Sequence, residues 1–90
     1  MPKLFVYGKY IIYFWSNEGD EPVHVHVSVK KQSTNSLKFW ITKNGKVILA
    51  NNKANISNHE ISKISNTIAS QTDYIIEQWK EHFGDVSYYC

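Results

Sequence analysis

The chain contains no arginine and only one cysteine, Cys90. Without arginine, no guanidinium group is present for bidentate recognition of a base or a carboxylate. With one cysteine, no disulfide can form within the chain, which fits a reducing cytoplasm. Four Gly and two Pro among 90 residues exclude collagen-like, low-complexity and disordered chains. We therefore expect one small globular domain.

Long hydrophobic runs are also missing. The longest strongly apolar run, from Tyr10 to Trp15, is far shorter than a membrane span. The N-terminal residues reach Gly8 and Lys9 before any apolar segment of signal-peptide length, and no small-residue cleavage site follows. We expect a cytoplasmic protein without membrane association.

The excess of positive over negative charge is small, because the net charge is only +2. Residues 1–50 carry seven lysines and three acids, a net charge of +4, whereas residues 51–90 carry three lysines and five acids, a net charge of −2. This distribution favours a mildly polarised surface, with a basic face for phosphates as the alternative.

The first half of the chain predicts a β-sheet. Strands are expected at Tyr10–Trp15, at Val23–Lys30 with strict alternation, at Leu37–Thr42 and at Val47–Ala50. Phe5–Tyr7 is expected to add only a little pairing. These segments predict a three- to four-stranded antiparallel meander.

The period changes to that of helices after residue 55. Ser57 and Glu60 form a capping box, and isoleucines follow at helical spacing to about Ser70. Thr72 or Ser70 is expected to cap a second helix, which Gly84 ends. We predict an α+β fold with two C-terminal helices on one face of the sheet, a single domain at 1–84 and a tail at 85–90.

His24 and His26 are the residues most suited to chemistry. They lie two apart on a strand whose valines face the core, so we expect the imidazoles to face away from the core. Three interpretations are open: an exposed polar pair, an RNA-cleaving acid–base pair, or a metal site. Lysines would steady the phosphate in the second, and a loop acid would add a ligand in the third. The candidates for these roles are Lys30 and Lys38 for phosphate, and Glu18, Asp20 and Glu21 for metal.

Trp40 shares a predicted strand face with Lys38. If the two strands pair, both side chains lie on the face of the histidines, which makes His24, His26, Lys38 and Trp40 a candidate binding face. A tryptophan beside a lysine on an open sheet can stack a base. A tryptophan covered by a helix or a subunit contact is the more ordinary case.

The stretch from Phe14 to Val27 resembles the signature of a family of small bacterial proteins known as domain of unknown function 4160 (DUF4160). Its marks are an aromatic strand, an acidic loop and a Pro-Pro-His-x-His-Val strand, with Val23 here in place of the second proline. A Lys-Phe-Trp strand follows at Lys38–Trp40, and Trp79 and Phe83 match the ending of the last helix.

The resemblance implies no established activity. Genes of this family often lie beside those of another small family, as in toxin–antitoxin pairs. The leading hypothesis is a non-enzymatic regulatory protein that binds a second small protein or a second copy of itself. An RNA-cleaving toxin and a metal-binding module are the alternatives. No cofactor is expected under the first two hypotheses, and zinc or another divalent metal under the third.

Overall fold

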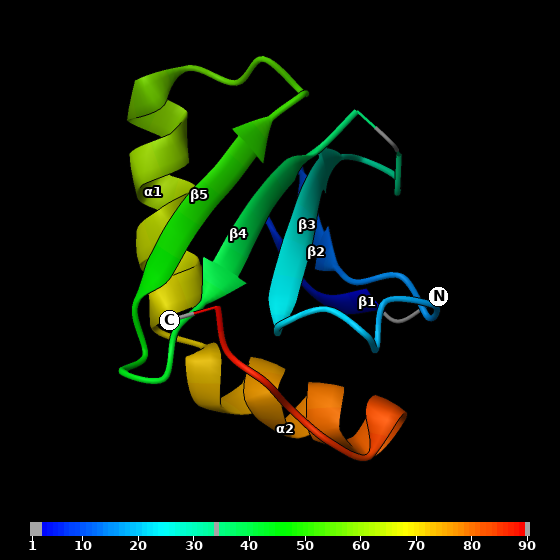
Figure 1. Ribbon diagram of the computed structural model, residues 1–90. Coiled ribbons are helices and arrows are strands. Elements are labelled where there is room, and N and C mark those ends of the chain that lie inside the picture. Colours follow the sequence, from blue (N-terminus) through cyan, green and yellow to red (C-terminus); the bar gives the residue numbers. More distant parts are fainter. Residues whose placement is uncertain (1–2, 34, 90) are drawn as a thin grey trace.

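The computed structural model describes residues 3–33 and 35–89, so Cys90 lies outside the described residues. One antiparallel sheet has its strands in chain order, followed by two helices (Figure 1). The elements are β1 (Lys3–Tyr7), β2 (Tyr10–Tyr13), β3 (His24–Val29), β4 (Leu37–Ile41), β5 (Val47–Asn52), α1 (Asn58–Ala69) and α2 (Thr72–Phe83). The predicted α+β meander with two C-terminal helices is confirmed.

The predicted number of strands was wrong, because the sheet has five. Phe5–Tyr7 belongs to β1, which pairs with β2 from Tyr7 opposite Tyr10 to Lys3 opposite Tyr13. Gly8 makes this hairpin possible, since its φ of 59° lies in the left-handed region that glycine adopts without a steric penalty.

The predicted strand Tyr10–Trp15 ends two residues early, at Tyr13. Phe14 leaves the sheet because its ring is buried against α2, with centroids 4.9 Å from Trp79 and 5.4 Å from Phe83. The chain then crosses residues 15–23 before it enters β3. This early exit sends an acidic segment back across one face of the sheet.

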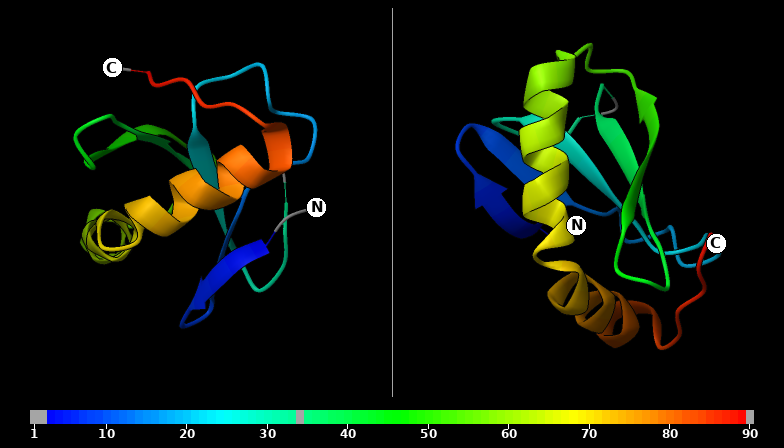
Figure 2. Two further views of the ribbon diagram at one scale, coloured as in Figure 1. Left: turned by 90° about the horizontal axis from the view of Figure 1, so that it is seen from below. Right: turned by 90° about the vertical axis from the view of Figure 1, so that its left-hand side faces the viewer.

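Helix α1 lies along the other face of the sheet (Figure 2). Ser57 caps it as predicted, with its side chain accepting the Glu60 N–H, and Ile64 and Ile68 are fully buried. They pack against the alternate apolar residues of the central strands, whose buried members are Ile12, Val25, Val27, Leu37, Phe39 and Ile41. This layer is the main core.

Helix α2 crosses the end of the sheet (Figures 1 and 2). The predicted cap at Ser70 or Thr72 was wrong, because the N-cap is Gln71 and it makes no side-chain capping bond. Gly84 ends the helix as predicted, with a φ of 80°. Within residues 3–33 and 35–89, no helix combines the length and the apolar character that crossing a membrane requires.

Residues 85–89 turn back across α2 and end near the C-terminal end of β4 (Figure 1). The Val23 N–H donates to the Ser87 carbonyl over 2.8 Å, and Val86 and Tyr88 pack against the core. The Tyr89 ring stacks on Trp40 with centroids 4.8 Å apart and planes 2° from parallel. The described part of the tail is therefore packed onto the domain.

Candidate metal centre

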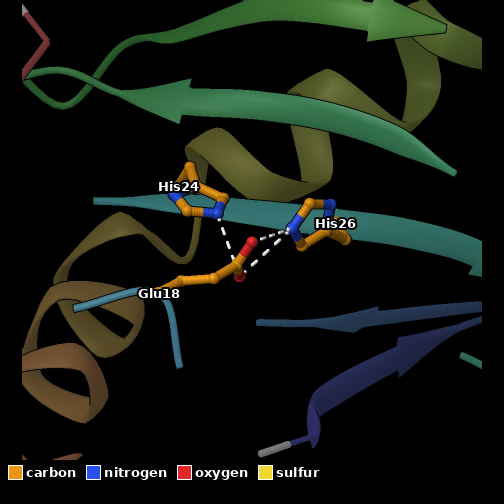
Figure 3. Close-up of side chains that lie close together, drawn as sticks. All are labelled: Glu18, His24 and His26. Atoms are coloured by element: carbon orange, nitrogen blue, oxygen red, sulfur yellow. Dashed lines mark hydrogen bonds and ion pairs between the residues drawn. The ribbon is translucent and has the colours of Figure 1, made fainter. Parts of the chain in front are cut away.

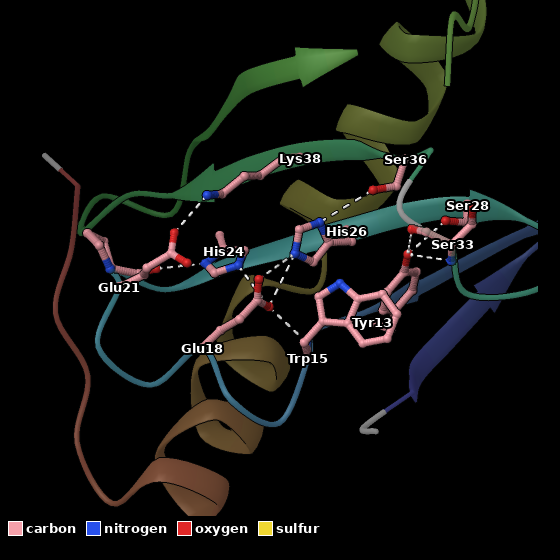
Figure 4. A network of polar contacts seen from close by, with 11 residues as sticks. Tyr13, Trp15, Glu18, Glu21, His24, His26, Ser28, Ser33, Ser36 and Lys38 are labelled. Atoms are coloured by element: carbon pink, nitrogen blue, oxygen red, sulfur yellow. Dashed lines mark hydrogen bonds and ion pairs between the residues drawn. The ribbon is translucent and has the colours of Figure 1, made fainter. Parts of the chain in front are cut away.

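Strand β3 places His24 and His26 on one face of the sheet, and β4 adds Trp40 opposite His24 and Lys38 opposite His26. The four residues thus share the face opposite the valines, as expected, but the imidazoles are buried, so the interpretation as an exposed polar pair does not hold. His24 is 0% exposed and His26 is 9% exposed. The reason is that the segment between β2 and β3 folds over this face, which the alternation of β3 does not encode (Figure 4).

The Glu18 carboxylate, from the folded-over segment, points between the two imidazoles (Figure 3). Its Oε1 lies 3.0 Å from His24 Nε2 and 3.2 Å from His26 Nε2. Its Oε2 lies 2.9 Å from His26 Nε2. The Trp15 N–H donates to Oε1 over 2.8 Å and holds the carboxylate in place. One ligand atom from each of the three side chains lies within 4.8 Å of the others.

The tautomer of His24 follows from its backbone contact. Nδ1 lies 2.9 Å from the Pro22 carbonyl, which can only accept, so Nδ1 carries a hydrogen. Nε2 of a neutral His24 therefore presents a lone pair to Glu18 Oε1. This buried nitrogen has no hydrogen-bond partner among the described residues. The short contact with the carboxylate does not have hydrogen-bond geometry and leaves the lone pair unsatisfied.

His26 faces the same carboxylate from the other side. Its Nδ1 lies 3.5 Å from the Ser36 hydroxyl, and the Tyr13 ring packs 5.6 Å from its own ring centre. These neighbours fix the ring orientation, so both imidazoles direct Nε2 at Glu18. Such supporting contacts on the second nitrogen are typical of metal-binding histidines.

The Glu18 carboxyl is ionised at neutral pH. Burial of this group acts to raise its pKa, but contacts with His24 and His26 and the Trp15 N–H together outweigh burial and lower the pKa well below its usual range. The site therefore offers one anionic oxygen and two imidazole nitrogens in a nearly buried position.

The separations between the carboxylate oxygens and each imidazole nitrogen are close to those between ligand atoms around a small metal ion. Bonds of about 2.0–2.1 Å at tetrahedral angles place ligand atoms about 3.3 Å apart, and right angles place them about 2.9 Å apart. The observed nitrogen–oxygen separations of 2.9–3.2 Å fall near both values. Two histidines and one carboxylate are a ligand set found in zinc and non-haem iron enzymes.

The other residues that the sequence singled out lie outside this triad. Glu21 pairs with Lys38 at 2.8 Å, and Lys38 Nζ lies 4.2 Å from the Trp40 ring centre. Asp20 is exposed. Lys30, four residues beyond His26 at the end of β3, is exposed and bonds through its backbone to Lys9.

The groups that support the triad were not predicted from the sequence. They are the Pro22 carbonyl against His24, the Trp15 N–H on Glu18, and the Ser36 hydroxyl and Tyr13 ring against His26. Figure 4 shows Trp15, Ser36 and Tyr13 around the triad. A proline just before the strand was the one available signal, because it fixes the chain direction ahead of His24. The remaining contacts join residues far apart in sequence.

We compared the chain with family models, with curated proteins and with solved structures, and a family model matches it. Neither the curated proteins nor the solved structures contain a match to this chain. The family model described as "Domain of unknown function (DUF4160)" matches residues 10–80, which include Glu18, His24 and His26 as well as the Trp15 N–H and the Pro22 carbonyl. The chain belongs to the DUF4160 family.

Proposed function

We propose that this protein binds a divalent transition-metal ion, with Zn²⁺ as the first candidate, through Glu18 and through Nε2 of both His24 and His26. The observation that carries the proposal is the buried lone pair of His24 Nε2, which faces a carboxylate oxygen at 3.0 Å and has no hydrogen-bond partner in the described residues. A cation between the two atoms satisfies both at once.

A purely structural hydrogen-bonded cluster accounts for less of the geometry. It leaves the fully buried His24 Nε2 at 3.0 Å from Glu18 Oε1 without a hydrogen bond. Neutral imidazoles, each steadied at its second nitrogen, are instead the form that binds a metal.

The geometry also favours metal binding over acid–base cleavage of RNA. An acid–base pair needs two side chains that reach opposite sides of a phosphodiester. Here both imidazoles point at one carboxylate, and His24 is completely buried. Lys30 lies about 13 Å from His26 along the strand, too far to share a phosphate with it.

Three protein ligands leave a fourth tetrahedral position open. In zinc proteins this position takes water, a substrate or a ligand from a partner, whereas purely structural sites are closed by four protein ligands. We therefore propose an open metal site, in which the Pro22 carbonyl and the Ser36 hydroxyl, each in contact with Nδ1 of one histidine, would orient the two imidazoles.

Metal content tests the proposal. Protein purified without an affinity tag, stripped with a chelator and dialysed against Zn²⁺ or Co²⁺, is expected to retain one ion per chain by elemental analysis. His24→Asn is expected to abolish retention while its amide preserves a donor to the Pro22 carbonyl. His26→Asn has the same expected effect on retention.

His59→Asn is the matched control, since His59 is exposed on α1. Circular dichroism of each variant separates loss of metal from loss of fold, and Glu18→Gln supplies a third variant that changes no ring packing. Wild-type protein that retains neither ion, or an equal loss of metal in the His59 variant, contradicts the proposal.

A second candidate function, binding of a small protein partner or a second copy of this chain, is favoured by a different observation. Strand β5 is an edge of the sheet, and it exposes two adjacent apolar side chains, Ile48 at 38% and Leu49 at 42%. Open edge strands with apolar side chains are templates for pairing with another strand. We propose β5 as the docking edge in a regulatory, toxin–antitoxin-like pair.

Oligomeric state and co-purification test this second candidate. Light scattering on purified protein is expected to show a homodimer, or a complex when the adjacent gene is co-expressed. Leu49→Lys is expected to dissociate either assembly, with Lys46→Gln in the same hairpin as the control. A strictly monomeric protein without a co-purifying partner contradicts it.

A further inference from the structure

A second candidate site lies on the same face of β3, beyond His26. It is a surface pocket of about 420 Å³ where the end of β3 meets the segment before β4 and the segment after β5. The lining residues are Ser28, Val29, Lys31, Ser33, Asn35, Lys53 and Ala54. Two of them are lysines and none is acidic, so the pocket has a positive character.

In the part of the chain that the structure describes, neither of the two lysines is paired with an acid, in contrast to Lys38 and Lys63. Lys38 pairs with Glu21, and Lys63 lies 3.7 Å from Glu60. Within the described ranges, neither Lys31 nor Lys53 forms an ion pair. They approach one pocket from segments 22 positions apart in sequence, so the fold gathers two uncompensated ammonium groups at one place.

A buried tyrosine holds the wall of the pocket. Tyr13 is 0% exposed, and its hydroxyl donates to the Ser33 carbonyl over 2.8 Å and accepts the Ser33 N–H over 3.1 Å. The Ser28 hydroxyl completes this cluster at 2.8 Å (Figure 4). The buried Tyr13 hydroxyl thus holds the Ser33 backbone in place, and this position orients the neighbouring residues Lys31 and Asn35.

The backbone beside the pocket is strained. Lys30 has a φ of 67°, in the left-handed region that a side chain disfavours, and the next N–H, of Lys31, bonds to the Val29 carbonyl at 2.8 Å. Across the pocket, Asn55 follows Ala54 with a φ of 55°. Backbone strain in a non-glycine residue persists where the surroundings fix it, and such residues gather at ligand sites.

From these observations we propose that the pocket binds the phosphate group of a small phosphorylated ligand. Two ammonium groups, with hydroxyl and amide donors from Ser33 and Asn35, match a dianion with three acceptor oxygens. The volume is that of sites for small molecules of about nucleotide size. This proposal does not depend on metal binding, because none of the pocket residues belongs to the triad.

Titration with defined phosphates tests the proposal. NMR amide shifts are recorded with inorganic phosphate, with a nucleoside monophosphate and with a sugar phosphate, which distinguishes the source of the group. A saturable response confined to the pocket residues is expected. In Lys31→Gln/Lys53→Gln protein the dissociation constant is expected to rise at least about tenfold, a loss of roughly 1.4 kcal/mol.

The matched control is Lys43→Gln/Lys46→Gln, which removes the same charge from exposed residues at the opposite end of β4. An equal effect of the two double variants indicates non-specific attraction and overturns the proposal. The proposal is also overturned if none of the small phosphates gives a saturable response. This holds even if a 5′-phosphorylated RNA binds. Circular dichroism spectra of both double variants that match the wild-type spectrum show that the fold is intact.

Discussion

At the scale of single residues, His24 shows which features of the site can be predicted from the sequence and which cannot. The His-x-His spacing on an alternating strand predicts two imidazoles on one face, and the structure has them there. Their burial and their common partner were not predictable, because both depend on where residues 15–23 fold. Glu18, Asp20 and Glu21 were equivalent candidates in the sequence, and only Glu18 meets the histidines.

Removing the charge of Glu18 is expected to separate metal binding from stability. In Glu18→Gln, an amide N–H can donate to the unsatisfied His24 Nε2, which offsets part of the stabilisation lost with the ionised carboxylate. The metal-free variant is therefore expected to be at most about 1–2 kcal/mol less stable than the wild type. Zinc at 100 times its dissociation constant is expected to stabilise the wild type by about 2.7 kcal/mol and the variant by nothing.

Urea denaturation with chelator and with Zn²⁺ measures both quantities. A variant that is stabilised by zinc as much as the wild type contradicts the role of Glu18 as a ligand. Large destabilisation in chelator alone indicates instead that Glu18 accepts hydrogen bonds from charged histidines.

At the scale of elements, β3 differs from the half-exposed strand that its alternation predicts. Its valines reach the core, and its polar residues His24, His26 and Ser28 are also buried. Alternation identifies which residues share a face, but it does not state what covers the second face. Here a loop covers it, and the loop is fixed by contacts with α2 that are remote in sequence.

Gly19 is one of these contacts between the loop and α2. A Cβ at this position would lie 2.6 Å from Phe83 Cδ1, in a ring already packed against Trp79 and Phe14. Gly19→Ala is therefore expected to displace the loop, to cost about 1–3 kcal/mol by overpacking, and to weaken zinc binding about tenfold or more by moving Glu18.

Calorimetric titration with Zn²⁺ and thermal unfolding check this prediction. Asp20→Ala, an exposed position in the same loop, is the control and is expected to change neither quantity appreciably. Unchanged affinity in Gly19→Ala would show that the position of Glu18 does not depend on this packing.

The contact between β2 and α1 is expected to be sensitive to alkaline pH. Burial raises the pKa of Tyr10 above 10.0, and its hydrogen bond to Glu60, at 3.0 Å, and the charge of Glu60 raise it further. A pKa raised in the folded state means that the contribution to stability is complete below about pH 10 and is lost as the pH rises through the raised value.

Tyr10→Phe isolates this contribution. The variant is expected to be about 1 kcal/mol less stable than the wild type near neutral pH. The difference in the free energy of unfolding between the two proteins is expected to shrink above about pH 10. A difference that is constant with pH contradicts the assignment.

At the scale of the whole molecule, local periodicity predicted the order and type of the elements, but not how the second face is closed. The strand that the sequence did not predict in full, β1, depends on the turn at Gly8. The docking of residues 85–89 depends on side chains that follow no local pattern. Both are decided by pairing and packing between distant parts of the chain.

The tail is expected to contribute to stability. Ending the chain after Gly84 removes the Val86 and Tyr88 contacts, the bond from Val23 to Ser87 and the stacking on Trp40. We expect a loss of about 2 kcal/mol, measured by thermal or urea unfolding. Tyr89→Ala, which removes only the stacking, is expected to lose about 1 kcal/mol. A truncated protein as stable as the full chain contradicts this account.

The most direct test of the central claim is the protonation state of the two imidazoles, read by long-range proton–nitrogen NMR with and without one equivalent of Zn²⁺. We predict that metal-free His24 carries its hydrogen on Nδ1, and that zinc shifts the Nε2 signals of His24 and His26 together while those of His59 and His82 stay unchanged. Two imidazoles whose signals ignore zinc, or a metal-free His24 protonated on both nitrogens, would contradict it.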